Sequence, residues 1–115
     1  MRFFRSQRVS SLIREKLSWI ILREIEVPGA LITLTDVKVE KKLEQAVVKF
    51  SVIPSERAPE ALKVLSAAAG KLRFILTREI NIKPMPRIIF EIDRGLENAA
   101  EVEKLLLRTD NHKDS

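Results

Sequence analysis

The sequence predicts a single α+β domain in which helices cover one face of a three-stranded sheet. Its 115 residues fall within the usual size of one domain, and no shift in composition divides the chain. Some stretches repeat apolar residues at three- and four-residue steps, which indicates helices, and others are rich in β-branched residues or alternate, which indicates strands. Because these stretches are too separated for an alternating βαβ array, an α+β sandwich is expected.

The first helix is predicted from about Gln7 to Glu26. Ser6 is the candidate N-cap, and Val27-Pro28-Gly29 should end the helix, because the residue before a proline disfavours the helical region. Trp19 lies at the edge of the apolar face and is expected in the core. Lys16 should lay its aliphatic stem along that face and keep its ammonium group in water. The apolar positions of the face are Val9, Leu12, Ile13, Leu17, Ile20, Ile21 and Ile25.

Two strands are predicted next, over Leu31–Glu40 and Ala46–Ile53. β-Branched residues are frequent in the first stretch, and the second alternates between apolar and polar positions. The polar link 41–44 is short enough for an antiparallel hairpin. The apolar phase of the first strand slips near Asp36, which predicts a β-bulge at this point.

A second helical region is predicted from Pro59 to about Ile80, because proline is well tolerated in the first turn of a helix. Gly70 lies inside it at a cost of about 1 kcal/mol relative to alanine, so two helices that meet at a sharp bend are expected. The stripe that should face the sheet consists of Leu62, Leu65, Ala69, Leu72 and Leu76.

The remainder of the chain is expected to form a turn, a third strand and a last short helix. Two prolines place the turn over 81–86, and Arg87–Ile92 has the composition of a strand. Apolar residues at helical spacing over 96–106 predict the final helix. The domain is therefore expected to span 1–108, with a polar tail over 109–115.

Composition restricts the class of protein. The chain has no cysteine, which excludes disulfides, thiolate nucleophiles and cysteine-bound zinc, and fits a reducing cytoplasm. Its longest apolar run, Trp19–Leu22, is far shorter than the roughly 20 residues needed to cross a bilayer, so no membrane span is expected. A formal net charge of +5 favours a polyanionic partner. Cations gather at the N-terminus and over 63–87 while acids gather near the C-terminus, so the molecule should be electrically polarised.

The order of elements is that of a type II KH domain, and the residues within it resemble the ribosome-binding factor A family. The stretches that carry the resemblance are Arg8-Val9-Ser10, 20–25, 32–37, 46–49, Ala68-Ala69-Gly70 followed by Leu72 and Arg73, and 86–90. The resemblance covers nearly the whole chain. It implies a KH-like RNA-binding fold with three strands, association with free 30S small ribosomal subunits, and help with late maturation of 16S rRNA.

Further expectations accompany that resemblance. It implies that the rRNA maturation includes the 5′ end, that the role in ribosome biogenesis matters most in the cold, and that the protein acts in the cytoplasm. No cofactor or metal is expected, and the protein is expected to be a monomer.

The family resemblance also directs attention to the middle of the second helical region. Ordinary KH domains clamp RNA with a Gly-x-x-Gly loop, which this sequence lacks. Ala68-Ala69-Gly70 stands in its place and matches the family's Ala-x-Gly kink, so the four-nucleotide clamp is in doubt. The kink is expected either to contact RNA or merely to let the helix cross the sheet closely.

Basic residues near this kink are the candidate RNA contacts. Projected around the helix, Lys63, Lys71 and Arg78 lie opposite the apolar stripe and form a basic ridge. Phe74 projects into the same ridge, where it can stack on a base unless the bend rotates it into the core, which is the outcome we expect. The complete set of candidates is Arg5, Arg8, Lys63, Lys71, Arg73, Arg78, Lys83 and Arg87. Arg2, Arg5 and Arg8 form a second candidate patch at the N-terminus, which is expected to be flexible and well suited to phosphate. The bland alternatives are a solvated helix face and a solvated N-terminus.

Catalysis is not expected. Cysteine and tyrosine are absent, and the sole histidine, His112, lies in the polar tail, where no metal site or catalytic base would be held in place. Glu97, Glu101 and Glu103 should form a solvated helix face rather than a metal site. Two other functions stay open: a general KH-like module for messenger or regulatory RNA, and a protein-interaction adaptor that binds no nucleic acid.

Overall fold

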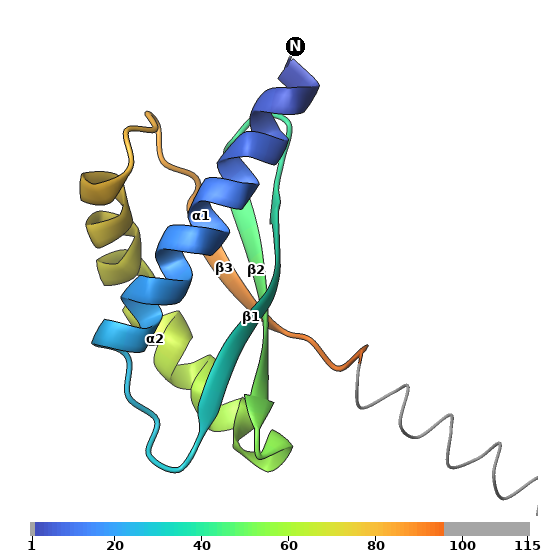
Figure 1. Ribbon diagram of the computed structural model, residues 1–115, viewed down its shortest axis with the longest axis vertical. Helices are drawn as coiled ribbons and strands as arrows, with labels where there is room; N and C mark the ends of the chain where they lie inside the picture. The colour runs from blue at the N-terminus through green and yellow to red at the C-terminus, as the bar shows by residue number, and fades with distance from the viewer. Residues whose placement is uncertain (1, 96–115) are drawn as a thin grey trace, which may run out of the picture.

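Two long helices lie on the same face of a three-stranded sheet (Figure 1). The computed structural model describes residues 2–95, and the predicted final helix and the polar tail lie outside these residues. The elements in chain order are α1 (Arg2–Glu24), β1 (Leu31–Val39), β2 (Gln45–Ile53), a short 3-10 turn η1 (Ser55–Arg57), α2 (Ala58–Glu79) and β3 (Arg87–Ile92). The predicted α+β order is confirmed, and β3 has the predicted bounds.

The strands follow the order β1-β2-β3, with β2 in the middle. β1 and β2 form the expected antiparallel hairpin, whereas β3 pairs with β2 in parallel because α2 carries the chain back to the other end of the sheet. The register of the hairpin shifts between Leu34 and Asp36, which confirms the predicted bulge and leaves Thr35 without a partner in the pairing.

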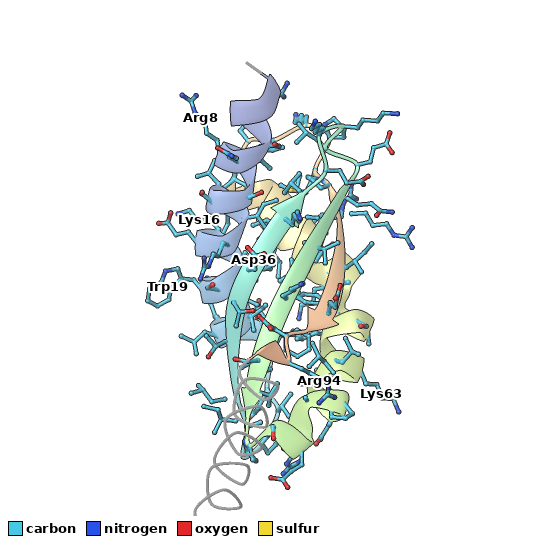
Figure 2. All side chains as sticks on the ribbon, turned by 90° about the vertical axis from the view of Figure 1, so that its right-hand side faces the viewer. Arg8, Lys16, Trp19, Asp36, Lys63 and Arg94 are labelled. Carbon is cyan, nitrogen blue, oxygen red and sulfur yellow. The ribbon has the colours of Figure 1, made fainter. Side chains whose placement is uncertain are left out.

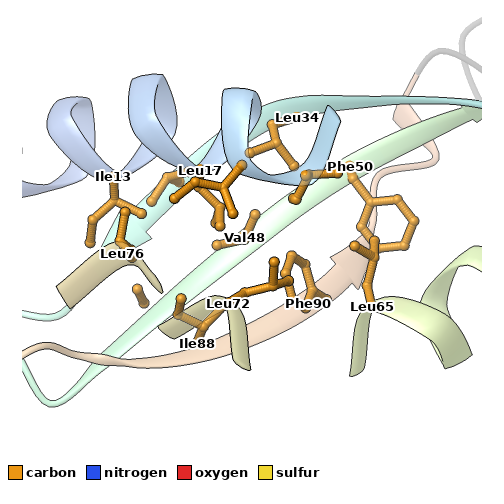
Figure 3. Close-up of a cluster of buried hydrophobic side chains, with 14 of the residues drawn as sticks. Ile13, Leu17, Leu34, Val48, Phe50, Leu65, Leu72, Leu76, Ile88 and Phe90 are labelled. Carbon is orange, nitrogen blue, oxygen red and sulfur yellow. The ribbon is translucent and has the colours of Figure 1, made fainter. Parts of the chain in front are cut away.

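The core fills the space between the sheet and the two helices. Figure 3 shows side chains from both helices and all three strands pointing into one cluster. Phe50 and Phe90 meet edge to face within it, with ring centroids 6.2 Å apart and planes at 78°. Each fully buried aliphatic or aromatic side chain contributes about 1.5–3 kcal/mol. The largest of them are Phe50, Ile13, Leu17, Ile20, Leu65, Leu72, Leu76 and Val48.

α1 differs from the predicted helix at both ends. It begins at Arg2 rather than Gln7, because no helix-breaking residue stands between these positions, so Ser6 is a helical residue and not an N-cap. Its carbonyl instead accepts a hydrogen bond from the hydroxyl of Ser10 at 2.8 Å. The helix ends at Glu24, two residues before the predicted end.

The prediction that Trp19 belongs to the core is wrong. Its side chain is 65% exposed, although Leu17 and Ile20 on either side are fully buried. Two residues correspond to about 200° around a helix, so Trp19 points away from the sheet when Leu17 points toward it. Lys16 is half-buried, as a stem lying along the apolar face requires.

α2 is one helix rather than the predicted pair. The helix continues through Gly70 without interruption, so the expected sharp break is absent. The axis of α2 instead changes direction between its two halves (Figure 1). A Cβ atom added at Gly70 would meet no atom within 4 Å. Gly70 is therefore not required for α2 to cross the sheet closely. The expectation that this glycine only permits a close crossing does not apply. Pro59 lies in the first turn, as predicted.

Candidate nucleic-acid interface

The outward face of α2 carries the predicted basic ridge. Buried residues of the helix, from Ala61 to Leu76, face the core, and the side chains opposite them are exposed. We define the α2 ridge as Lys63, Lys71, Phe74 and Arg78, all of which are exposed. Figure 2 shows Lys63 pointing away from the body of the molecule. Ala67 and Gly70 lie on the same outward side, so no bulky side chain separates the charges.

Phe74 is part of this surface and not of the core, contrary to the prediction. Its side chain is 63% exposed, because it lies two residues from both Leu72 and Leu76, which are fully buried. The change in direction of α2 does not rotate it inward. The guanidinium carbon of Arg78 lies 6.0 Å from the centre of the Phe74 ring, a cation–π arrangement. The step of about 200° from the buried leucines is the sequence signal that identifies Phe74 as an outward residue.

The acidic residues of α2 do not neutralise the ridge. Glu60 pairs with Arg57 at 2.5 Å, and Glu79 pairs with Arg23 of α1 at 3.2 Å. Within residues 2–95, Lys63 and Lys71 form no ion pair, so their ammonium groups face water. The outward face of α2 is therefore positively charged and has an exposed aromatic ring between its cations.

Arg73 lies at the side of α2 and fastens the turn that precedes β3. Its Nη2 donates to the carbonyl oxygen of Met85 at 2.6 Å, and its Nε donates to the carbonyl oxygens of Met85 and Pro86 at 3.2 and 3.3 Å. This structural contact depends on the turn of 81–86 folding back onto α2, which no sequence pattern indicated. The predicted RNA contact of Arg73 stays a prediction.

A groove of about 410 Å³ lies beside Arg73, between α2 and β3. Three of the predicted site residues line it: Gly70 and Arg73 of α2, and Arg87 of β3. Ala69 also lines the groove, whereas Ala68 is half-buried and does not. The full lining is Ser66, Ala69, Gly70, Arg73, Arg87, Ile88, Ile89 and Phe90.

The other predicted cations lie at one end of the molecule. Arg5 and Arg8 are exposed residues of α1, so they are held on a helix and do not form the flexible N-terminal segment that was expected. Lys83 is exposed in the turn of 81–86, which lies at the same end as the start of α1 (Figure 1). Figure 2 places Lys63 toward the opposite end, so the predicted set is spread along the molecule rather than gathered in one patch.

The face of the sheet that the helices leave open carries a different charge pattern. It faces the viewer in Figure 2, where Asp36 is labelled. Lys49 of β2 is paired in register with Asp36 on one side and Glu91 on the other. Acidic residues thus flank the central cation of this face, which makes it a poorer surface for a polyanion than the α2 ridge.

Asp93 adds a further carboxylate to that face. Its Oδ2 accepts a hydrogen bond from the Thr35 hydroxyl at 2.6 Å, and its Oδ1 accepts one from the Gly95 amide at 2.9 Å. The Thr35 bond, followed by the Gly95 bond and the charge of Lys49, lowers the pKa of Asp93, with partial desolvation acting in the opposite direction. The bulge residue Thr35 is therefore linked to the chain that leaves β3.

Metal sites and membrane spans find no support in the described part of the chain. Between positions 2 and 95, no group of three or more metal-ligating side chains comes together. In the same range, neither helix combines the length and the apolar character that crossing a bilayer requires. Glu97, Glu101, Glu103 and His112, which were considered as metal or catalytic residues, lie outside the described residues.

Comparison with known proteins gives a consistent result. The family model described as ribosome-binding factor A matches residues 5–106. Ribosome-binding factor A of Caldanaerobacter subterraneus is 36% identical over 106 residues, which cover 90% of this chain and 87% of that protein. The protein of the same name from Clostridium perfringens strain 13 is 34% identical over 110 residues, covering 92% of this chain and 95% of that protein.

Solved structures share the fold. The crystal structure of ribosome-binding factor A from Thermus thermophilus superposes with a TM-score of 0.69 at 24% identity, covering 78% of this chain and 97% of that one. A homology model of the Thermus thermophilus factor, fitted into a cryo-EM map of a 30S complex, gives a TM-score of 0.65 at 24% identity, covering 74% and 91%. These likenesses agree with the predicted KH-like α+β fold. On the match of the family model and the identity to its relatives, the chain belongs to the ribosome-binding factor A family.

Proposed function

We propose that this protein binds the free 30S ribosomal subunit and assists late maturation of 16S rRNA, with the α2 ridge as a principal contact. The observation that carries the proposal is an exposed row of cations around an exposed phenylalanine on a face where the acids are already paired. Membership of the ribosome-binding factor A family and the complex of the Thermus thermophilus factor with the 30S subunit supply the partner. A ribosomal partner in turn favours a protein that acts in the cytoplasm. It would act by binding rather than by catalysis.

The ridge suits structured RNA for two physical reasons. Lys63, Lys71 and Arg78 can each approach a phosphate, and the release of condensed counterions then makes the affinity fall with salt. The Phe74 ring can accept a stacked base from an unpaired position, which is worth about 1–3 kcal/mol per base. Groups of this kind recognise a phosphate backbone and an exposed base without reading a long sequence.

The first experiment compares charge reversal on two surfaces. Changing Lys63, Lys71 and Arg78 to glutamate should abolish co-sedimentation with free 30S subunits, while circular dichroism shows the fold retained. The matched control changes Lys38, Lys41 and Lys42, which are exposed on and beside the β1–β2 hairpin, to glutamate and should preserve binding. Binding that survives the first triple change, or that is lost equally in both, would rule out the ridge as a specific contact.

Phe74 permits a test of stacking that leaves the charge unchanged. Phe74→Ala should weaken 30S binding by roughly 5- to 150-fold if one base stacks on the ring. Trp at the same position should restore it, because the indole ring also offers a flat face. If wild type and Phe74→Ala bind the 30S subunit with the same affinity, no base stacks on Phe74 and the α2 ridge contacts phosphates only.

The finer role in rRNA maturation requires a cellular readout. Cells that lack the protein should accumulate 16S precursors with an unprocessed 5′ end, most strongly at low temperature, and the ridge variant should not restore processing. A general RNA-binding module would instead bind many single strands as well as it binds 30S subunits. A protein adaptor would bind with little dependence on salt and would tolerate the ridge changes.

A further inference from the structure

The open face of the sheet carries two apolar side chains at one end. Leu31 of β1 and Ile53 of β2 are 56% and 67% exposed. They are paired in the register of the hairpin, so their side chains are neighbours on the same face. The alternation of β2 buries Phe50 and Val52 toward the helices, which places Ile53 on the open side. We call this pair the Leu31–Ile53 patch.

The chain that leaves β3 is directed onto this face. The Asp93 amide donates to the Phe50 carbonyl of β2 at 2.7 Å, while the Asp93 carboxylate accepts from the Thr35 hydroxyl of β1 at 2.6 Å. Because β2 lies between β1 and β3, the Asp93 side chain lies across the open face of β2. Figure 2 shows the end of β3 turning across the front of the sheet. The bond between Thr35 and Asp93 therefore fixes the direction in which the chain continues.

Asp93 also caps the start of a helix. Its Oδ1 accepts from the Gly95 amide at 2.9 Å, which is the contact that an N-cap carboxylate makes two residues into a helix. Gly95, the last described residue, is itself helical. The first turn of the helix predicted from the sequence is thus anchored at the open face.

The sequence beyond Gly95 predicts a helix with one apolar side. At steps of three and four residues, that side consists of Leu96, Ala99, Val102 and Leu106, and the opposite side has Glu97, Glu101 and Lys104. A helix over 96–106 is about 16 Å long. On β2, the distance from Phe50, where Asp93 is bonded, to Ile53 is only about 10 Å. The predicted helix is therefore long enough to cover the Leu31–Ile53 patch.

Charges on the open face decide the direction of this helix. Thr33 and Ser51, which are paired and uncharged, lie between Asp93 and the patch. In the opposite direction lies Lys49, with an acidic residue on either side. Covering those three groups would remove charges from water, which is unfavourable. The apolar side of the helix is thus favoured over the patch.

We propose that the segment 96–106 folds as a helix over the Leu31–Ile53 patch of its own chain and that the Thr35–Asp93 bond directs it there. Leu96 then lies against Ile53, and Ala99 lies against Leu31. Only residues 93–95 join the segment to the sheet, so its effective concentration at the patch is on the order of millimolar or higher. A small apolar contact is then favoured within the chain over the same contact with another molecule. The inference goes beyond the proposed function and involves no residue of the α2 ridge.

Cysteine cross-linking tests the contact directly, because the natural chain has no cysteine. In the full chain, Ile53→Cys combined with Leu96→Cys should oxidise readily to an intramolecular disulfide, which requires Cα atoms within about 7 Å. The control combines Ile89→Cys with Leu96→Cys, since Ile89 is exposed on the same face but lies farther from the patch than Lys49. The control pair should stay reduced under the same conditions. Thr35→Val should slow the Ile53–Leu96 cross-link, and Thr35→Ser, which keeps the hydroxyl, should not.

A double-mutant cycle tests the same contact without a new bond. Leu96→Ser should lower the urea midpoint of the wild-type chain but have a much smaller effect in Ile53→Ser, because side chains in contact are energetically coupled. Glu97→Ser, on the opposite side of the predicted helix, is the control and should leave the midpoint unchanged.

Four results would overturn the proposal. Equal oxidation of the two cysteine pairs would show that the segment does not stay at the patch, and additive effects in the cycle would show that Leu96 and Ile53 do not touch. An unchanged cross-linking rate in Thr35→Val would remove the bond to Asp93 as the cause of the direction. A disulfide that forms only between two molecules, or only with added 30S subunits, would assign the patch to another copy or to the ribosome. The α2 ridge variant tests the proposed function separately, since it alters neither the patch nor the segment.

Discussion

Replacing Arg73 should destabilise the fold, because its guanidinium joins α2 to the turn before β3. One of its contacts is short, at 2.6 Å from Nη2 to the Met85 carbonyl, and two are longer, at 3.2 and 3.3 Å. A hydrogen bond with a charged partner contributes about 1.5–3 kcal/mol net, and the exposed side of the guanidinium places this group toward the lower part of that range. We count the short contact fully and the two long contacts partially. Arg73→Met should then lower the free energy of unfolding by about 2 kcal/mol.

Urea unfolding followed by circular dichroism measures this loss as a lower midpoint with an unchanged slope. Arg73→Lys should recover only part of it, because an ammonium group cannot reproduce the planar fork. Lys71→Met, two residues away and exposed, is the control and should stay within about 0.5 kcal/mol of wild type. Wild-type stability in Arg73→Met would refute the claim that Arg73 stabilises the fold through the turn. If 30S binding also falls in Arg73→Met but not in Arg73→Lys, Arg73 is a phosphate contact.

Two further predictions concern the bend and the open sheet face. Gly70→Ala should stabilise the protein by about 0.5–1 kcal/mol in the same urea assay, because the position is helical and a Cβ meets no neighbour; a loss of stability would mean that the bend needs glycine. Thr35→Val should raise the pKa of Asp93 in an NMR titration of its carboxyl group, since the hydroxyl bond is the main cause of the lowered value. A lowered native pKa stabilises the fold above the unfolded pKa, and this contribution disappears as pH falls through the native pKa, so the variant should lose less stability on acidification. An unchanged pKa in Thr35→Val would contradict that cause.

Most of the fold could be predicted because its signals are local. The bulge near Asp36 appears as a slip in apolar alternation, and Pro59 marks the start of α2 through its own backbone restriction. The unbroken helix through Gly70 could not be predicted in the same way. The glycine penalty is only about 1 kcal/mol, and the burial of Leu65, Leu72 and Leu76 on both sides of Gly70 exceeds it.

The candidate site was predicted in part. Lys63, Lys71 and Arg78 lie on the outward face of α2, as projection around a helix requires. Trp19 was assigned to the core because it lies at the edge of the apolar face, and Phe74 because a bend at Gly70 was expected to rotate it inward. Both instead lie two residues from a buried leucine and are exposed. Because α2 is one continuous helix, the angular position of Phe74 relative to Leu72 and Leu76 is kept, and the ring points outward.

The sequence by itself determined which stretches are helix and strand, which faces of them are apolar, and where the positive charge gathers. These properties depend on residues a few positions apart, whose interactions are set by the local backbone. Only the tertiary structure decided that Arg73 reaches the carbonyl of Met85 and that Arg87 lines the same groove as Gly70. Such contacts join residues that become neighbours only after the helix packs on the sheet, and a linear pattern does not encode that distance.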